Sequence, residues 1–158
     1  MAQLRATPLL IATVILATGC STLQAQRDPW CRQLAAYANT AQVDAPRSIE
    51  LVTDWSRWSK GCEDDGSDAG KQFCHWLIPN TSTEFASANI RHTLACLDPT
   101  AIHAGRLRST PVYITGKVEV YGAPMIDEDV MVTVEYADGI EGQLPHMKIQ
   151  AERTPLDD

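Results

Sequence analysis

The chain has 158 residues, of which 44% are hydrophobic and 21% charged, a composition typical of one folded domain rather than a disordered chain. Its formal net charge of −7 argues against a nucleic-acid binder, which needs a basic face, and against attraction to anionic lipids. Any membrane attachment must therefore come from something other than surface charge.

The N-terminus has the layout of an export signal. Arg5 precedes the apolar run Leu9–Ala17, which is too short to span a bilayer, and small residues then lead to Gly19 and Cys20. This pattern resembles the lipobox of bacterial lipoproteins, in which small residues precede a cysteine that becomes acylated. The resemblance implies that residues 1–19 are a signal peptide that is removed. It also implies that Cys20 carries a diacylglyceryl thioether and an N-acyl chain such as palmitate.

The resemblance covers residues 1–21, and no domain family is recognised beyond them. Because Ser21 rather than Asp follows Cys20, it resembles the outer-membrane sorting pattern of enteric-type bacteria. Several acyl chains hold a protein on a membrane firmly, whereas one chain binds marginally. Residues 20–27 would then be a lipid-anchored tether to a single small domain, residues 28–158, that faces the periplasm.

Two helices are predicted at the start of this domain. Asp28 is a suitable N-cap and Pro29 fits a first helical turn, so a helix is expected to continue through residues 30–38. Its apolar stripe consists of Trp30, Leu34 and Tyr37. A second helix is expected over residues 46–60, ending at Gly61. Its apolar positions, at i, i+4 and i+7, are Leu51, Trp55 and Trp58.

Another pair of helices is predicted next. Residues 70–78 form a short apolar pattern that Pro79 is expected to end. Thr81 and Glu84 have the spacing of a capping box, which favours a following helix. The apolar face of that helix consists of Ala86, Ile90, Leu94 and Leu97.

The four cysteines that remain after Cys20 predict two disulfides, because an even number in an exported chain indicates a disulfide framework. They are Cys31, Cys62, Cys74 and Cys96. Their number alone allows three pairings. Each pair of predicted helices has an early cysteine and a late one, and antiparallel helices bring such positions together. We therefore favour Cys31–Cys62 and Cys74–Cys96. A zinc site is the alternative, but it lacks a C-x-x-C pair.

The C-terminal third changes to an alternating pattern. Apolar residues alternate with polar ones over residues 111–120, 130–137 and 146–152, as they do in half-buried strands. Asp138 and Gly139 predict a turn between the second and third strands.

The expected fold class is therefore α+β. Two disulfide-stapled helical hairpins over residues 28–98 would precede a small antiparallel three-stranded meander over residues 111–152. Three strands need a cover for their apolar face. The helices can supply that cover, or the face or an edge strand receives a partner.

No catalytic motif is present, and no metal site is predicted. The acidic run over residues 63–68 does not fit the spacing of an EF-hand and is interpreted as a solvated loop. His75 and His92 lack a third ligand for a metal ion. Glu50 and Asp54, four residues apart, are interpreted as an exposed helix face. We therefore predict no catalytic residue and no cofactor beyond the covalent lipid.

The tryptophans lie in the predicted helical part. Most of them are expected in the core, with one or two on a ligand or partner surface. They are Trp30, Trp55, Trp58 and Trp76.

The sequence favours a non-enzymatic lipoprotein of the Gram-negative outer membrane, with a binding or assembly role and a protein partner in the envelope. The first alternative is a periplasmic inhibitor or immunity protein against a cell-wall-degrading enzyme, because an acidic face can be steered to a basic enzyme. The second alternative is a cell-wall hydrolase. That enzyme would need a cleft with perturbed titratable groups around His75, His92 or Glu84.

Overall fold

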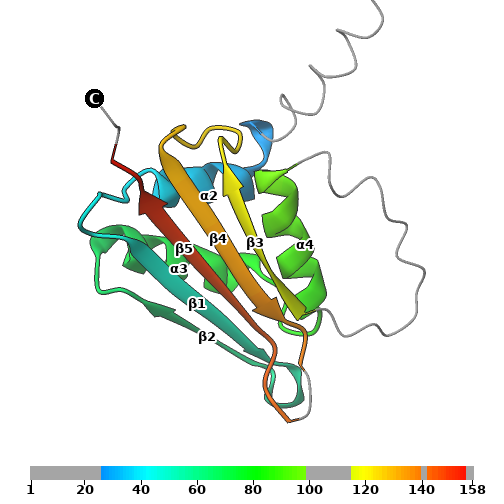
Figure 1. Cartoon of the computed structure of the whole chain (residues 1–158). Coiled ribbons are helices and arrows are strands. Elements are labelled where there is room, and N and C mark those ends of the chain that lie inside the picture. Colours follow the sequence, from blue (N-terminus) through cyan, green and yellow to red (C-terminus); the bar gives the residue numbers. More distant parts are fainter. Residues whose placement is uncertain (1–25, 99–114, 140–141, 156–158) are drawn as a thin grey trace, which may run out of the picture.

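Three helices cover one face of a five-stranded antiparallel sheet in the computed structural model, which describes residues 26–98, 115–139 and 142–155 (Figure 1). The helices are α2 (Pro29–Ala38), α3 (Asp68–Asn80) and α4 (Ala86–Leu97). The strands are β1 (Arg47–Asp54), β2 (Ser59–Asp64), β3 (Thr115–Tyr121), β4 (Val130–Ala137) and β5 (His146–Arg153). Their order across the sheet is β2-β1-β5-β4-β3. The α+β class is confirmed.

The helix predicted over residues 46–60 is wrong. This segment forms β1, a single 3-10 turn (Trp55–Arg57) and β2, which pair as an antiparallel hairpin. Residues 28–98 are therefore not purely helical, and the sheet gains two strands. The helical spacing of Leu51 and the two tryptophans misled the prediction, because both tryptophans lie in the turn rather than in the core.

The three strands predicted at the C-terminal end form part of the larger sheet. β4 has the predicted bounds, β5 extends one residue further, and β3 begins at Thr115 within the described residues. They lie side by side in the order β5-β4-β3, so the meander is present but does not stand alone. β5 pairs with β1 on its other side, which joins the meander to the hairpin.

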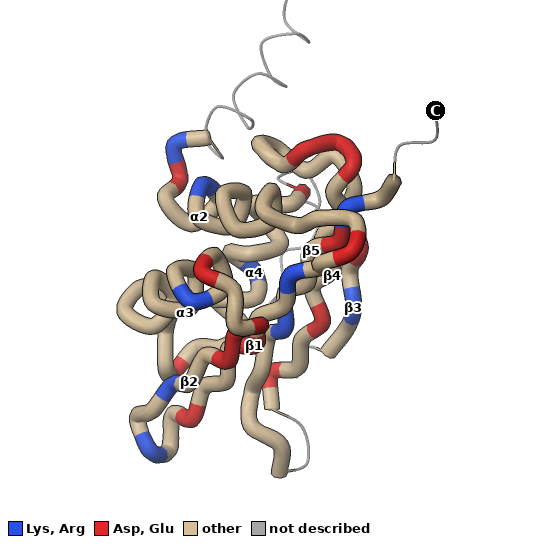
Figure 2. The backbone as a smooth tube through the Cα atoms, turned by 90° about the vertical axis from the view of Figure 1, so that its left-hand side faces the viewer, with Lys and Arg blue, Asp and Glu red and all other residues tan. Residues whose placement is uncertain are grey.

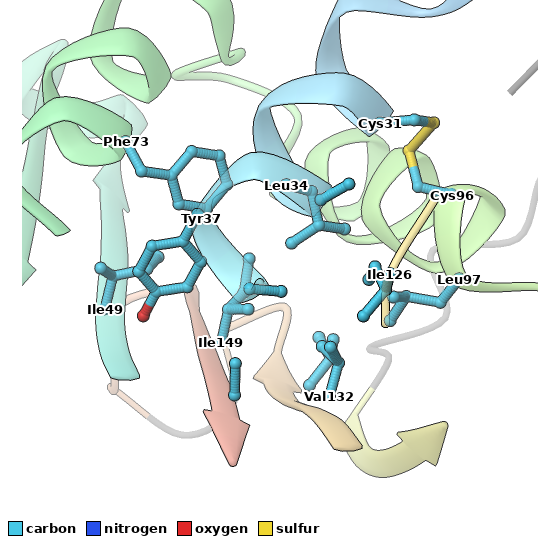
Figure 3. Close-up of a cluster of buried hydrophobic side chains, with 14 of the residues drawn as sticks. Cys31, Leu34, Tyr37, Ile49, Phe73, Cys96, Leu97, Ile126, Val132 and Ile149 are labelled. Carbon is cyan, nitrogen blue, oxygen red and sulfur yellow. A yellow bond between two sulfur atoms is a disulfide. The ribbon is translucent and has the colours of Figure 1, made fainter. Parts of the chain in front are cut away.

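The core lies between the inner face of the sheet and the helices (Figure 3). Ile49 on β1, Ile149 on β5 and Val132 on β4 point toward Leu34 of α2 and are at most 1% exposed. Tyr37 of α2 stacks on Phe73 of α3 with ring centroids 4.8 Å apart. Alternate positions on each strand supply this face, as a strand period of two requires.

The predicted disulfide pairing is wrong. Cys31 on α2 pairs with Cys96 on α4, and Cys62 on β2 pairs with Cys74 on α3. Their Cα atoms are 5.0 and 5.5 Å apart, respectively. The expected pairing assumed that Cys62 ended a helix next to α2. Because β2 is instead an edge strand that packs against α3, the nearest partner of Cys62 is Cys74.

The two predicted N-terminal caps have different outcomes. Asp28 caps α2 as expected, since its carboxylate accepts a hydrogen bond from the Trp30 amide at 2.8 Å. The capping box at Thr81 and Glu84 is wrong, because the Thr81 hydroxyl donates to the Leu77 carbonyl instead. Asn89 of α4 reaches back and bonds both backbone groups of Ser82, which fixes the turn into that helix.

Candidate functional site

Four large apolar side chains are exposed near one end of the sheet. They are Trp55 and Trp58 in the β1–β2 turn, Phe85 before α4, and Leu144 between β4 and β5, with exposed fractions of 60%, 71%, 58% and 47%, respectively. In Figure 1 the β1–β2 turn and the β4–β5 connection lie together at the lower end of the sheet. We call these four residues the tryptophan end. Exposed aromatic groups of this size are typical of interaction surfaces.

The β1–β2 turn holds its two indoles on a short, well-bonded loop. Asp54 accepts hydrogen bonds from the Ser56 hydroxyl at 2.6 Å and from the Arg57 amide at 3.2 Å. These bonds, the one from the Ser56 hydroxyl most of all, lower the pKa of Asp54 below its ordinary value. The carboxylate therefore stays charged and fixes the turn from within.

Trp58 ends this turn in a left-handed backbone conformation, with φ of 50°. Bulky side chains rarely adopt this region, which glycine occupies without penalty. Its amide donates to the Trp55 carbonyl at 3.2 Å, which closes the turn. The chain thus places a mostly exposed indole at a position that glycine would occupy without this strain.

A cleft of about 480 Å³ lies beside Trp55. Its wall combines the indole with apolar Leu144 and Pro145 and with the carboxyl groups of Glu84 and Asp138. Burial raises the pKa of Asp138, against the opposing effects of Arg91 and a hydrogen bond with Ser87. Glu84 lines this cleft and directly precedes Phe85, so the α3–α4 connection adjoins the β1–β2 turn.

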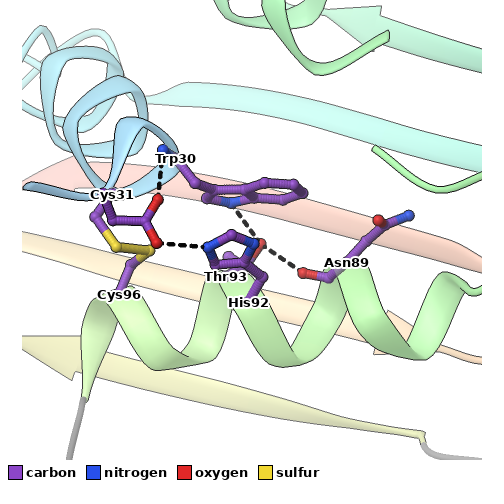
Figure 4. Close-up of a disulfide and its surroundings, with 7 residues drawn as sticks. Trp30, Cys31, Asn89, His92, Thr93 and Cys96 are labelled. Carbon is purple, nitrogen blue, oxygen red and sulfur yellow. Dashed lines mark hydrogen bonds and ion pairs between the residues drawn. A yellow bond between two sulfur atoms is a disulfide. The ribbon is translucent and has the colours of Figure 1, made fainter. Parts of the chain in front are cut away.

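The two histidines for which the sequence offered no third metal ligand have separate surroundings. His92 on α4 stacks on Trp30, with ring centroids 4.5 Å apart, and its Nε2 lies 2.8 Å from Asp28 (Figure 4). Partial burial opposes ionisation of Asp28, but hydrogen bonds with His92 and the Trp30 amide outweigh it and lower the pKa of the carboxyl. His75 is exposed and lines a different groove with Trp76. In the described part of the chain, no group of three or more His, Cys, Asp or Glu side chains is placed to hold a metal ion.

The acidic run has a local structural role. Asp64 and Asp65 accept hydrogen bonds from the amides of Gly66 and Ser67, and Ser67 caps α3 through the Gly70 amide. Burial on its own would raise the pKa of Asp65, but its hydrogen bonds and Arg47 lower it. Glu50 lies on the outer face of β1 rather than on a helix.

The charged residues are unevenly distributed (Figure 2). The β3–β4 connection includes Asp127, Glu128 and Asp129, whereas the β1–β2 turn contributes Arg57, whose side chain is 83% exposed. Arg153 binds both Asp127 and Asp129, so part of the acidic group is neutralised within the fold. The tryptophan end therefore combines aromatic groups with an exposed cation on an acidic protein.

Comparisons with protein-family models, with curated proteins and with solved structures found no match. Among the described residues, no helix has the length and apolar character needed to cross a bilayer. Cys20 lies outside the described residues. The tryptophan end was not predicted as a site, although the sequence allowed for one or two tryptophans on a partner surface. The alternation of Ile49, Leu51 and Thr53 could have revealed the hairpin that forms it.

Proposed function

We propose that this chain is a lipid-anchored protein of the bacterial outer membrane whose periplasmic domain binds a protein partner through the tryptophan end. The observation that supports this proposal is the clustering of exposed Trp55, Trp58, Phe85 and Leu144 on adjoining connections. A soluble domain gains nothing from exposing two indoles, whereas tryptophan and arginine are the residues that most often dominate protein interfaces. Arg57, between the two tryptophans, completes that combination.

A non-enzymatic role agrees with the surroundings of the titratable groups. Asp54 is engaged by Ser56 and Arg57, and His92 is engaged by Asp28 and stacked on Trp30. Both arrangements fix backbone segments in place. His75, His92 and Glu84, the groups that a hydrolase was expected to use, line different parts of the surface.

The proposed anchor leaves the tryptophan end accessible. The described chain begins beside α2, at the upper end of the sheet in Figure 1, whereas the β1–β2 turn lies at the lower end. Residues 20–27 can span about 26 Å when extended. The lipid on Cys20 would therefore hold the domain from the end away from the proposed docking surface.

An inhibitor or immunity protein against a cell-wall-degrading enzyme is the second candidate. The feature that favours it is the β1–β2 turn, which presents two indoles on four residues and so suits insertion into a cleft of the partner. The formal net charge of −7 would also steer the domain to a basic enzyme. Inhibition of a cell-wall hydrolase by the purified protein would separate this role from an assembly role.

The docking surface is tested by crosslinking from solubilised cell envelopes. The variant Trp55→Ser/Trp58→Ser is expected to lose the partner that the wild-type protein captures. Val43→Ser is the matched control, because Val43 is 49% exposed and lies before β1, at the end of that strand opposite the β1–β2 turn. Equal capture by the wild type and the double variant would refute docking through the tryptophan end.

The anchor is tested separately with Cys20→Ala. This variant is expected to lose labelling by a fatty-acid analogue and to move from the membrane fraction to the soluble periplasm. Unchanged labelling and membrane fractionation would refute lipidation at Cys20.

A further inference from the structure

Within the described residues, β3 forms the longer of the two outer edges of the sheet, and this edge is open to another strand. β3 comes last in the order β2-β1-β5-β4-β3 and pairs with β4 over an unbroken register from Thr115 to Tyr121. Its other edge pairs with no described strand. The backbone groups along such an edge are a template for pairing with a further chain. The opposite edge, β2, is shorter and is held to α3 by the disulfide of Cys62.

The sequence of β3 is complementary to itself. Lys117 and Glu119 flank Val118 and lie on the outer face of the sheet, whereas Val118, Gly116 and Val120 lie on the inner face. If two copies of β3 pair antiparallel about Val118, each Lys117 faces Glu119 of the second copy. Directly opposite side chains in such a pair have Cβ atoms about 4.5–5.5 Å apart, close enough for two symmetric ion pairs.

Neighbouring registers lack this complementarity. Centring the pair on residue 117 places Lys117 opposite itself, and centring it on residue 119 places Glu119 opposite itself. Like charges directly opposite each other destabilise a sheet. If the pair is centred between two residues, inner-face residues of one copy lie opposite outer-face residues of the other, so the two faces do not match. Among these registers, only the one centred on Val118 matches both the charges and the faces.

The charged residues on the outer face of each sheet alternate in sign toward the β3 edge. Along one row of the outer face, the register places Glu50 of β1 next to Lys148 of β5, then Glu135 of β4, then Lys117 of β3. Glu119 of a second copy would follow Lys117 and continue the alternation of sign. Within one copy, Lys117 lies 2.7 Å from Glu119, and its side chain is 56% exposed, so it is free to form a second ion pair.

We propose that two copies of this chain form a closed dimer through antiparallel pairing of β3, centred on Val118. The two sheets become one continuous sheet, and the half-buried Val118 gains Val118 of the second copy as a neighbour on the inner face. Both β3 edges are used in the pairing, so the assembly ends at two copies. The inference does not depend on the proposed function, because the β1–β2 turn with its two tryptophans lies near the opposite edge of the sheet.

The alternative role of a charged edge is to prevent pairing, for which proteins often use lysine. That role requires a charge that stays unmatched when a second strand approaches. Lys117 does not meet this condition, because the approaching copy offers Glu119 at the opposite position. The two roles therefore predict opposite results when these charges are reversed.

The test uses the chain from residue 20 onward with Cys20→Ala, which retains every described residue, and measures association by sedimentation equilibrium. The wild-type protein is expected to dimerise with rising concentration, and salt is expected to weaken the dimer. Lys117→Glu and Glu119→Lys are each expected to weaken self-association by about tenfold or more, because both symmetric pairs become repulsive. An equal mixture of the two variants is expected to restore the dimer, since each then meets its complement.

Lys148→Glu reverses the same charge on a central strand and should leave the dimer intact. Thermal unfolding of each variant shows whether it is folded. The proposal is overturned if the wild type stays monomeric, if either single variant dimerises like the wild type, or if the mixture fails to associate.

A cysteine scan tests the register itself. Val118→Cys is expected to give a disulfide-linked dimer, because paired Cα atoms about 4.5–5.5 Å apart fall within the range that a disulfide bridges. Glu119→Cys is the control, since the two copies of that residue would be diagonal neighbours about 7–8 Å apart. Crosslinking at residue 119 but not at 118 would refute the register. If neither Val118→Cys nor Glu119→Cys gives a crosslinked dimer, the dimer is refuted. That result is expected if other residues of the same chain cover the β3 edge.

Discussion

At the scale of single residues, Trp58 is where stability and the proposed function diverge. Its left-handed backbone conformation and its 71% exposure both make it a poor choice for stability. Strained backbone conformations of this kind cluster at functional sites, where the side chain is needed for binding. The conformation of one residue thus supports the docking role independently of its exposure.

Replacing Trp58 with glycine is therefore expected to stabilise the fold. Trp58→Gly relieves the left-handed strain, but glycine also loses more backbone entropy on folding. The net gain in the free energy of unfolding is about 0.5–1 kcal/mol. Urea unfolding monitored by circular dichroism measures this change. Trp55→Gly is the control. Because Trp55 lies in the 3-10 turn, this variant is expected to be less stable than the wild type. A loss of stability in Trp58→Gly would show that the indole packs onto the domain.

Asp28 acts on both α2 and α4, since it caps one helix and pairs with His92 of the other. Asp28→Asn keeps a good cap but removes the charge, so it is expected to lower the unfolding free energy by about 0.5–1 kcal/mol at neutral pH. The folded-state pKa of Asp28 is lowered, so its ionisation stabilises the fold above the unfolded-state pKa and loses this effect as pH falls through the lower folded value.

The stability difference between the wild type and Asp28→Asn should consequently begin to shrink as pH falls below about 4 and vanish below the folded-state pKa. Urea unfolding of both proteins from neutral to acid pH measures the difference. A difference that stays constant over this range would contradict a role for the ionised carboxylate.

At the scale of helices and strands, the sequence predicts well where one period dominates. The alternation over residues 130–137 gives β4 without error, and the Asp28 cap gives the start of α2. The segment over residues 46–60 satisfies two periods at once, because its tryptophans have helical spacing while Ile49, Leu51 and Thr53 alternate. Tertiary contacts decide such a case, since β1 is buried between β2 and β5 in the sheet.

The disulfides could be predicted in number but not in connectivity. Their pairing depends on Cys62 lying on a strand beside α3, and the wrong secondary structure of that segment led to the wrong pairing. The candidate site shares this dependence, because the tryptophan end exists only where a hairpin turn brings Trp55 and Trp58 into solvent. A single misassigned element therefore accounts for both errors.

The two disulfides are expected to contribute unequally to stability. Cys31–Cys96 joins residues 65 apart in sequence and Cys62–Cys74 joins residues 12 apart. In the loop-entropy model these separations correspond to about 4 and about 3 kcal/mol, respectively. Urea unfolding of Cys31→Ser/Cys96→Ser and of Cys62→Ser/Cys74→Ser tests this order. A larger loss for the second variant would show that fixing β2 against α3 matters more than restricting the unfolded chain.

At the scale of the whole molecule, the two faces of the sheet differ in role. The inner face is covered by helices α2, α3 and α4, while the outer face presents the charged row that includes Glu50, Lys148 and Glu135. Two separate features are then available for interaction, the tryptophan end and the β3 edge. Because they lie at different places on the sheet, a dimer could present two tryptophan ends at once, and binding to a partner with repeated sites would gain from avidity.

The nested disulfides also bear on how the protein is made. Cys62–Cys74 lies inside the stretch of chain that Cys31–Cys96 closes. If the chain enters the periplasm amino end first, Cys31 meets Cys62 well before Cys96 emerges, and an oxidase acting at once would link the wrong pair. The native arrangement is then reached by thiol–disulfide exchange. Biogenesis of this protein is therefore expected to depend on a disulfide isomerase, and an expression host that lacks one would accumulate a mispaired product.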